Sequence, residues 1–243
     1  STRITDALDE TAALSLLRGA VSIESITGNE ADFAQHLYLL MLDREFQTDQ
    51  AEFLPGRPNV WGHRRGNGAG PHLLITGHTD TVRVDGWQER WEGSERESPF
   101  GGAEVDGAIW GRGVTDLKGG ICTAFAALDV LKTAGIKLAG DISFAFIGDE
   151  ESGEDGTGVS VGIEHYTNMI AVGDLPKPDF AVYVEPTQLD IYAAQIGFFI
   201  ADVTVTGTSA YFSHPELGVD ALKAAHSILT SVWEHGETLR GRD

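Results

Sequence analysis

The chain has 243 residues, of which 42% are hydrophobic and 22% charged, so it can form one large or two small globular domains. Its formal net charge of −20 disfavours nucleic acid and anionic membranes as partners, because both are bound through basic side chains. No apolar run approaches the roughly 20 residues of a membrane span, and the single cysteine, Cys122, excludes a disulfide within the chain. These features predict a cytoplasmic protein whose many carboxylates either hold cations or keep the surface soluble.

Hydrophobic periodicity predicts helices alternating with strands, and a long polar surface loop at residues 83–106. Helices are expected at about residues 6–22, 30–43, 118–133, 158–170 and 219–234. Strands or strand-like turns are expected at about residues 45–53, 58–64, 72–78, 108–113, 141–148, 180–184 and 198–206. Asn29 is a candidate N-cap of the second helix, and Gly135 is expected to end the third. This alternation predicts an α/β fold with a mostly parallel sheet and helices on both faces.

The character of the sequence changes after residue 195. Residues 198–206 alternate as in an antiparallel strand covered on one face, and a single helix follows. One strand and one helix cannot close a hydrophobic core. We therefore expect a first domain at residues 1–195 and, at residues 196–243, the start of a smaller α+β domain that is incomplete in this sequence.

An acidic motif follows the apolar run that ends near residue 147. Asp149, Glu150 and Glu151 place three carboxylates in a row, with Gly148 before them and Gly153 shortly after. Their mutual repulsion is unfavourable unless a positive charge lies nearby. The motif is either a solvated acidic turn or a site in which one carboxylate binds a metal ion and its neighbour transfers a proton. Adjacent residues on extended backbone point in different directions, which would allow this division of tasks.

Other residues of ligand type also follow expected strands. His78 ends an apolar strand, and the carboxylate of Asp80 can hold its second ring nitrogen. Asp116 precedes a helix, where it is either an N-cap or a carboxylate able to bridge two cations. Glu185 follows another strand. Parallel sheets place their sites at the carboxyl ends of strands, so these residues together predict a metal site.

Four motifs carry a resemblance to a known family. They are Gly77–Val82, Trp110–Gly120, Gly148–Gly153 and Ser213–Leu222. In their order and spacing the chain resembles the co-catalytic dinuclear metallopeptidase and deacylase family, which includes acetylornithine deacetylase, succinyl-diaminopimelate desuccinylase, aminoacylase and glutamate carboxypeptidase. The resemblance implies that residues 1–195 form the N-terminal part of a zinc-peptidase-like catalytic domain. It also implies that a lid domain begins near residue 196 and forms a homodimer.

The resemblance further implies two divalent metal ions and their ligands. His78 and Glu185 would ligate the first ion, Asp116 would bridge, and Glu151 would ligate the second. Mixed histidine and carboxylate ligands favour zinc, with manganese or cobalt as alternatives. By the same resemblance, Glu150 would be the general base and acid, and Asp80 would orient His78.

The chain departs from the family pattern in two places. The family takes a second-site histidine from beyond the lid, and no histidine of this chain lies in such a motif, so we expect a fragment with an incomplete second metal site. Tyr211 stands where the family's lid carries a histidine that polarises the substrate carbonyl, and His214 lies three residues later. Either Tyr211 replaces that histidine, His214 reaches in from a shifted loop, or the reaction differs.

Three functions are compatible with these residues. The first is a metal-dependent hydrolase that cleaves the amide C–N bond of an N-acyl amino acid or small peptide, with metal-activated water and Glu150 as general base. The second is a metal-dependent aminohydrolase that deaminates a small amine, aromatic amines included, a reaction that does not need the lid histidine. The third is a non-catalytic metal-binding or dimerisation fragment of the family.

Overall fold

The computed structural model describes residues 2–151, 160–195 and 201–240. The chain forms two units, Ser1–Ile191 and Tyr192–Asp243. This division lies close to the change of character expected after residue 195, although residues 196–200 fall outside the described part of the chain. The assignment of the two units as a catalytic part and a lid stays a prediction.

The first unit alternates helices and strands. Its helices and helical turn are α1 (Thr2–Thr5), α2 (Glu10–Val21), α3 (Ala31–Asp43), α4 (Trp87–Trp91), η1 (Val114–Lys118), α5 (Gly119–Thr133) and α6 (Val161–Val172). Its strands are β1 (Gln47–Leu54), β2 (Arg57–Arg64), β3 (Gly70–His78), β4 (Ala103–Val105), β5 (Ala108–Trp110), β6 (Gly140–Ile147) and β7 (Phe180–Tyr183). The described part of the second unit contains η2 (Pro215–Leu217) and α7 (Ala221–Arg240).

Five strands of the first unit form one sheet in the order β1-β2-β6-β3-β7. β6 pairs in parallel with β3, and β3 in parallel with β7. β2 runs antiparallel to both of its neighbours, β1 and β6. All the strands of this sheet except β2 therefore point the same way, which confirms the α/β fold with a mostly parallel sheet.

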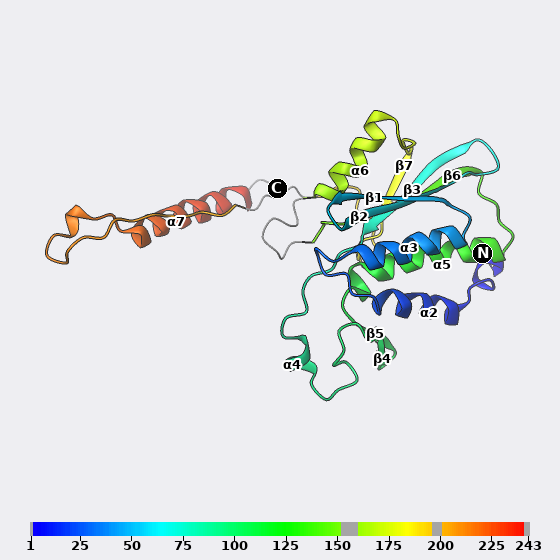
Figure 1. Cartoon of the computed structure of the whole chain (residues 1–243), viewed down its shortest axis with the longest axis horizontal. Coiled ribbons are helices and arrows are strands. Elements are labelled where there is room, and N and C mark those ends of the chain that lie inside the picture. The colour runs from blue at the N-terminus through cyan, green and yellow to red at the C-terminus, as the bar shows by residue number, and fades with distance from the viewer. Residues whose placement is uncertain (1, 152–159, 196–200, 241–243) are drawn as a thin grey trace. The chain divides into compact units, whose positions relative to one another are not determined.

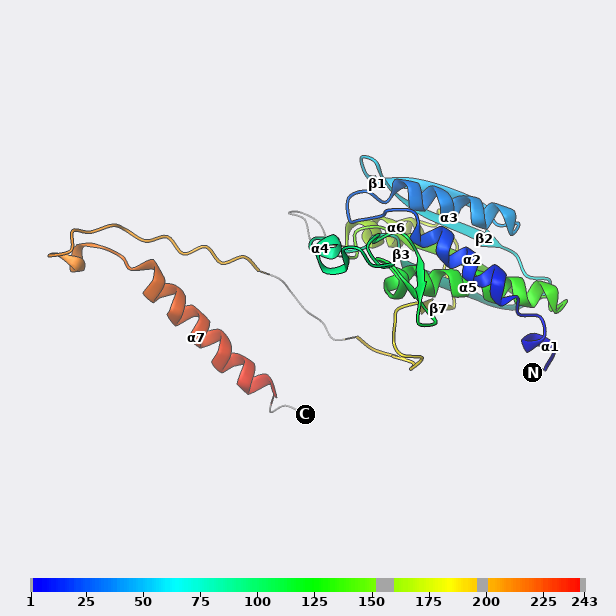
Figure 2. The ribbon, with the colours of Figure 1, turned by 90° about the horizontal axis from the view of Figure 1, so that it is seen from below.

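Helices cover both faces of this sheet (Figure 1). α2, α3 and α5 lie side by side on one face, and α6 lies on the other (Figures 1 and 2). Strand β6 serves both layers, because its side chains alternate: Phe144 and Phe146 belong to the core under α3 and α5, and Ala145 and Ile147 pack with α6.

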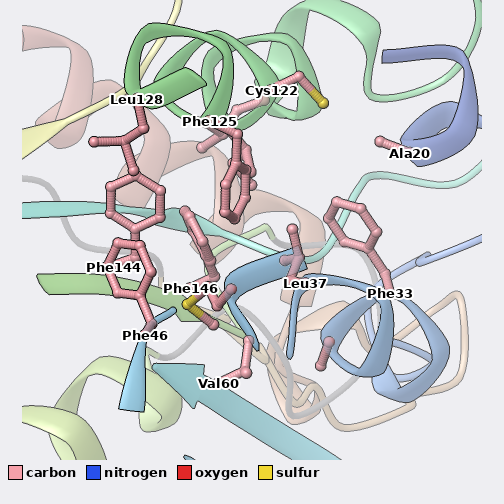
Figure 3. Packing of buried hydrophobic residues seen from close by; sticks show 14 of the residues in the cluster. Ala20, Phe33, Leu37, Phe46, Val60, Cys122, Phe125, Leu128, Phe144 and Phe146 are labelled. Carbon is pink, nitrogen blue, oxygen red and sulfur yellow. The ribbon is translucent and has the colours of Figure 1, made fainter. Parts of the chain in front are cut away.

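The larger core is built around aromatic rings (Figure 3). The ring of Phe144 packs edge-on against that of Phe125 from α5, with centroids 4.9 Å apart, and the centroid of the Phe46 ring lies 5.1 Å from that of Phe144. Full burial of each such side chain stabilises the fold by about 1.5–3 kcal/mol. This core holds β3, β6 and α5 rigidly, and their ends carry the candidate site.

Several local expectations need correction. Asn29 does not cap α3: Glu30 occupies the N-cap position, and the backbone amide of Asn29 instead donates to the carbonyl of Ile26 in a turn. The expected loop at residues 83–106 contains α4 and strand β4, which pairs with β5 in a hairpin. Gly135 does follow the end of α5 with a positive φ of 65°, as a glycine at a helix end can.

The expectation of a strand at residues 198–206 was also wrong for residues 201–206, which the structure describes. Residues 198–200 lie outside the described part, and residues 201–206 have no strand conformation. A strand needs a neighbour for its backbone groups, and the described part of this unit offers only an isolated bridge between Thr208 and Val219. Among the described helices of both units, none combines the length and the apolar character that crossing a membrane requires.

Candidate metal centre

Three neighbouring strands bring expected site residues together. β3 ends at His78, β6 leads into Glu150 and Glu151, and β7 leads into Glu185. Because β6, β3 and β7 are adjacent and parallel, their carboxyl ends meet at one edge of the sheet. The apolar residues of β6 are buried in the core, whereas β7 is an exposed strand at the edge of the sheet that is held by its pairing with β3. The sheet therefore supports the polar residues at these three strand ends.

The buried imidazole of His78 lies at the centre of these carboxylates. Its Nε2 atom is 3.0 Å from Oδ1 of Asp116, 3.6 Å from Oε1 of Glu185 and 3.9 Å from Oε2 of Glu150. Its Nδ1 atom is 2.8 Å from the backbone carbonyl oxygen of Asp80. Donation from Nδ1 to that carbonyl leaves Nε2, which faces the carboxylates, as the atom that can bind a cation.

Asp116 reaches the cluster from the distorted turn η1. The backbone angles of Asp116 (φ −121°, ψ 96°) and Leu117 (φ −136°, ψ 26°) are not helical. The N-cap of α5 is Lys118, so the interpretation of Asp116 as the cap of this helix was wrong. The carboxylate of Asp116 instead contacts His78, and 51% of the Asp116 side chain is exposed to solvent. It is therefore placed to bind a cation from the open side of the cluster.

Asp80 contacts His78 through its backbone. Its carboxylate oxygen Oδ1 is 3.8 Å from His78 Nδ1, too far for a hydrogen bond. The carboxylate instead accepts hydrogen bonds from the backbone amides of Glu150, at 3.2 Å, and Glu151, at 2.9 Å. The hydroxyl of Thr27 donates to the same carboxylate at 3.1 Å. Asp80 thus holds the loop that carries the two glutamates, and its main chain orients the imidazole.

Two groups of ligand atoms have the spacing that a bound cation needs. One contains His78, Glu150 and Glu185, the other contains His78, Asp116 and Glu151, and within each group the atoms lie within 4.8 Å of one another. Carboxylate oxygens with one imidazole nitrogen suit zinc, manganese or cobalt. One imidazole cannot balance the charge of these carboxylates, so the donor set fits divalent cations. Glu150 belongs to one group by distance, so its role as a free base stays a prediction.

Burial and mutual repulsion shift the pKa values of these side chains. The pKa of Glu151 is raised to about 7, first by burial and then by the negative charge of Asp116. Burial by itself lowers the pKa of His78, but the hydrogen bond with Asp116 and the charges of Asp80, Glu150 and Glu185 outweigh it and raise that pKa to about 9. Protons and cations therefore compete for the same atoms in this cluster.

The sequence model of peptidase family M20/M25/M40 matches residues 74–238 of this chain. This range is more than half of the chain and includes His78 and all the carboxylate residues that surround it. The chain belongs to peptidase family M20/M25/M40. This confirms the resemblance inferred from the four motifs.

Two curated relatives and one solved structure with the same fold illustrate what this chain is similar to. Succinyl-diaminopimelate desuccinylase of Methylobacterium sp. (strain 4-46) is 32% identical over 83% of this chain and 50% of its own length. Acetylornithine deacetylase of Proteus mirabilis (strain HI4320) is 33% identical over 73% of this chain and 40% of its own length. The structure of the di-peptidase Dug1p from Saccharomyces cerevisiae shares the fold, with a TM-score of 0.62 and 20% identity over 75% of this chain and 40% of that one. The chain spans about half the length of the first curated relatives it matches.

The second unit of this family chain carries Tyr211 and His214. The Tyr211 side chain is exposed and its ring packs against that of Phe212, with centroids 4.5 Å apart. His214 Nδ1 lies 3.2 Å from Oε1 of Glu216. These contacts lie within the second unit, so a contribution of Tyr211 or His214 to the metal centre stays a prediction.

Two contributors to the centre were not expected from the sequence. Tyr183 forms a side-chain hydrogen bond with Glu185, and burial together with the charges of Glu150 and Glu185 raises the pKa of its phenol. Tyr183 ends β7 and Glu185 lies two positions later, a spacing that on extended backbone puts two side chains on one face, and that spacing was the available signal. Thr27, which donates to Asp80, lies far away in the sequence and gave no comparable signal.

Proposed function

We propose that the protein is a hydrolase that cleaves the amide C–N bond of an N-acyl amino acid or a small peptide with the help of two divalent cations. The observation that carries this proposal is the convergence of His78, Asp116, Glu151 and Glu185 on one sheet edge beside Glu150. Isolated acidic residues are common on surfaces, but this cluster surrounds a buried imidazole at the ends of parallel strands.

The proposed cation ligands are His78, Asp116, Glu151 and Glu185. Zinc is the favoured ion, and manganese and cobalt are the alternatives. When bound, such ions act as Lewis acids that polarise a substrate carbonyl and make a water molecule more acidic. Asp80 keeps His78 in the tautomer that presents Nε2 and holds the Glu150–Glu151 backbone in place.

Glu150 is the proposed proton carrier. Its carboxylate lies at the edge of the cluster, 3.9 Å from His78 Nε2, and its side chain is 44% exposed, so a substrate can reach it. Its pKa is raised, first by burial and then by the charges of Asp80 and Asp116, against the opposing effect of His78. A raised pKa brings a carboxylate closer to the working pH, where it can take a proton from the attacking water and give one to the leaving amine.

The curated relatives named succinyl-diaminopimelate desuccinylase and acetylornithine deacetylase support an N-acylated amino acid as substrate. A homodimer through the second unit is a further proposal. It is supported by apolar side chains that α7 leaves exposed, among them Val232 and Trp233.

The test is a product assay on the full-length gene product. N-acetyl and N-succinyl amino acids, dipeptides and small aromatic amines would each be incubated with zinc, cobalt or manganese, and free amine, free carboxylate and ammonia would be measured. New amine and carboxylate ends from an acylated amino acid or a peptide are the expected result. Ammonia from an amine substrate would support the aminohydrolase alternative. No turnover together with fewer than two metal ions per chain would support the non-catalytic alternative.

A further inference from the structure

A buried arginine lies directly behind the acidic motif. Arg57 is the first residue of β2 and is 7% exposed. Because β2 runs antiparallel to β6, the beginning of β2 lies beside the carboxyl end of β6, where the motif starts. Arg57 Nη1 is 3.0 Å from Oδ1 of Asp149, the first of the three consecutive carboxylates.

The same guanidinium holds a second buried carboxylate. Glu30, at the N-cap position of α3, is fully buried, and its two oxygens lie 2.5–3.2 Å from Nε and Nη2 of Arg57. Such a two-point contact fixes the plane of the guanidinium and not only its position. The ring of Phe53 packs against the guanidinium, with its centroid 5.1 Å from Arg57 Cζ. Glu30 and Phe53 therefore fix the orientation in which the Arg57 guanidinium contacts the acidic motif.

Asp149 is fully buried and connects Arg57 to the next helix. Its Oδ1 contacts Arg57, and its Oδ2 accepts a hydrogen bond from the backbone amide of Val161, at the start of α6. Its φ of 70° lies in the left-handed region, which a residue other than glycine keeps only when its surroundings enforce it. Asn59 adds a second connection, because it accepts from the amide of Gly148 at 3.1 Å and donates to the carbonyl of Gly162 at 2.7 Å.

We propose that Arg57 is a positioning residue of the metal centre, which holds Asp149 inward so that Glu150 and Glu151 face the cations. The motif then carries one buried anchor and two carboxylates that are available to the site. This inference deepens the proposed function and rests on it for the role of the cations. In this proposal Arg57 acts through Asp149 and the backbone that follows it.

The physical reason is charge balance at a buried position. Without the guanidinium, the buried carboxylates of Glu30 and Asp149 would lose the positive charge that both contact, which is strongly destabilising in a protein interior. Asp149 would then turn toward solvent and change the direction of the residues after it. The amides of Glu150 and Glu151 would lose their alignment with Asp80.

A structural role alone would also make Arg57 important, so the test needs a matched control. Arg44 provides one, because it forms a two-point contact with Asp129, at 2.9 and 2.6 Å, and packs over the ring of Phe125. Arg44 follows α3 and Asp129 lies on α5, and neither contacts the acidic motif. Arg44→Met therefore removes a two-point arginine contact elsewhere in the first unit, one whose carboxylate is 46% exposed where that of Glu30 is buried.

The first experiment measures cobalt binding to the full chain by calorimetry, and the coordination geometry from the visible absorption of the bound ion. For Arg57→Met and Asp149→Asn we expect the affinity to fall about 10- to 100-fold, with a changed cobalt spectrum. Arg57→Lys, which keeps the charge but loses the two-point contact, should recover part of the affinity. Arg44→Met should keep the wild-type affinity and spectrum.

The second experiment needs no cation. Amide hydrogen exchange of residues 148–151 in the metal-free protein should become at least tenfold faster in Arg57→Met and stay unchanged in Arg44→Met. A folded Arg57→Met variant with wild-type exchange at these amides would overturn the proposal. If Arg57→Met does not fold, the exchange of the same amides is measured in Asp149→Asn, and wild-type exchange in that variant would overturn the proposal. A wild-type chain that binds no cobalt would contradict the proposed function, and the exchange result would still decide the role of Arg57.

Discussion

The backbone carbonyl of Asp80 lies 2.8 Å from Nδ1 of His78, while the Asp80 carboxylate oxygen Oδ1 is 3.8 Å from that atom, beyond hydrogen-bond distance. The carboxylate is thereby available to the amides of Glu150 and Glu151, which belong to the neighbouring strand end. Asp80, just beyond the end of β3, thus has two tasks. Its main chain orients His78, the last residue of β3, and its side chain holds Glu150 and Glu151, which follow β6. We infer that the relative position of the two strand ends depends on this carboxylate.

The first prediction concerns the Asp80 carboxylate. In Asp80→Asn, one acceptor oxygen becomes an amide donor that would face the backbone N–H of Glu150 or Glu151. Leaving such a buried donor unpaired costs about 1–3 kcal/mol of folding free energy. We expect a loss of this size in urea unfolding and an approximately 10- to 100-fold loss of cation affinity. Thr27→Val, which removes a single hydroxyl donor to the same carboxylate, should have a smaller effect on both measurements. Equal effects of the two variants would contradict this account.

The second prediction separates proton transfer from cation binding at Glu150. If Glu150 carries protons and is not a ligand, Glu150→Gln should keep both cations and lose about 100- to 10,000-fold in kcat. Metal content per chain and kcat would be measured on the same sample. Glu151→Gln is the comparison, because Glu151 is a proposed ligand and its variant should lose a cation. Loss of a cation in Glu150→Gln would instead assign Glu150 to the ligand group with His78 and Glu185.

The third prediction is the pH dependence of stability without cations. The folded-state pKa of Glu151 is raised to about 7 and that of His78 to about 9, so these two groups bind more protons in the folded chain than in the unfolded chain. The contributions of these two groups to stability therefore fall as the pH rises, between about 4.5 and 7 for Glu151 and between about 6.5 and 9 for His78. Cations bind the deprotonated side chains, so excess cobalt should reverse this trend.

Thermal unfolding from pH 5 to pH 9.5, with EDTA or with excess cobalt, measures this dependence. In EDTA, the difference in Tm between Glu151→Gln and the wild type should grow between pH 5 and pH 7, because glutamine does not ionise. A difference that stays constant over this range would show that Glu151 titrates near its ordinary value.

The residues at the strand ends could be predicted because their signal is local. His78 ends one apolar run of strand type and Glu185 follows another, and parallel strands bring such positions together. The positions of Arg57 and Glu30 could not be predicted in this way. Their contact depends on the antiparallel pairing of β2 with β6 and on the angle at which α3 begins, and no short stretch of sequence encodes either.

Two wrong expectations have the same physical origin. The alternation at residues 198–206 is typical of a strand, but alternation describes a face and not the partner strand that the backbone requires. Asp80 lies at the right spacing to hold His78, but spacing does not tell which of its oxygen atoms, main chain or side chain, makes the contact. Sequence patterns locate residues, and the choice among their alternative contacts depends on tertiary structure.

The last prediction concerns the packing of α5 against the end of β7. A Cβ atom added at Gly120 would overlap the carbonyl oxygen of Val184, the residue before Glu185. Gly120→Ala must therefore push the helix away from the strand end, at a cost of about 1–3 kcal/mol for overpacking. The displacement moves Glu185 directly, and a misplacement of about 1 Å can reduce activity about 100-fold.

Gly19→Ala is the matched control, because Gly19 lies inside α2 and a Cβ there would meet no atom within 4 Å. Alanine favours helix over glycine by up to about 1 kcal/mol, so this variant should be as stable as the wild type or more stable. Urea unfolding and cobalt titration of both variants give the comparison. We expect Gly120→Ala to lose stability and cation affinity together, while Gly19→Ala loses neither. Full cation affinity in Gly120→Ala would mean that Glu185 does not need the close contact between α5 and β7 in order to bind.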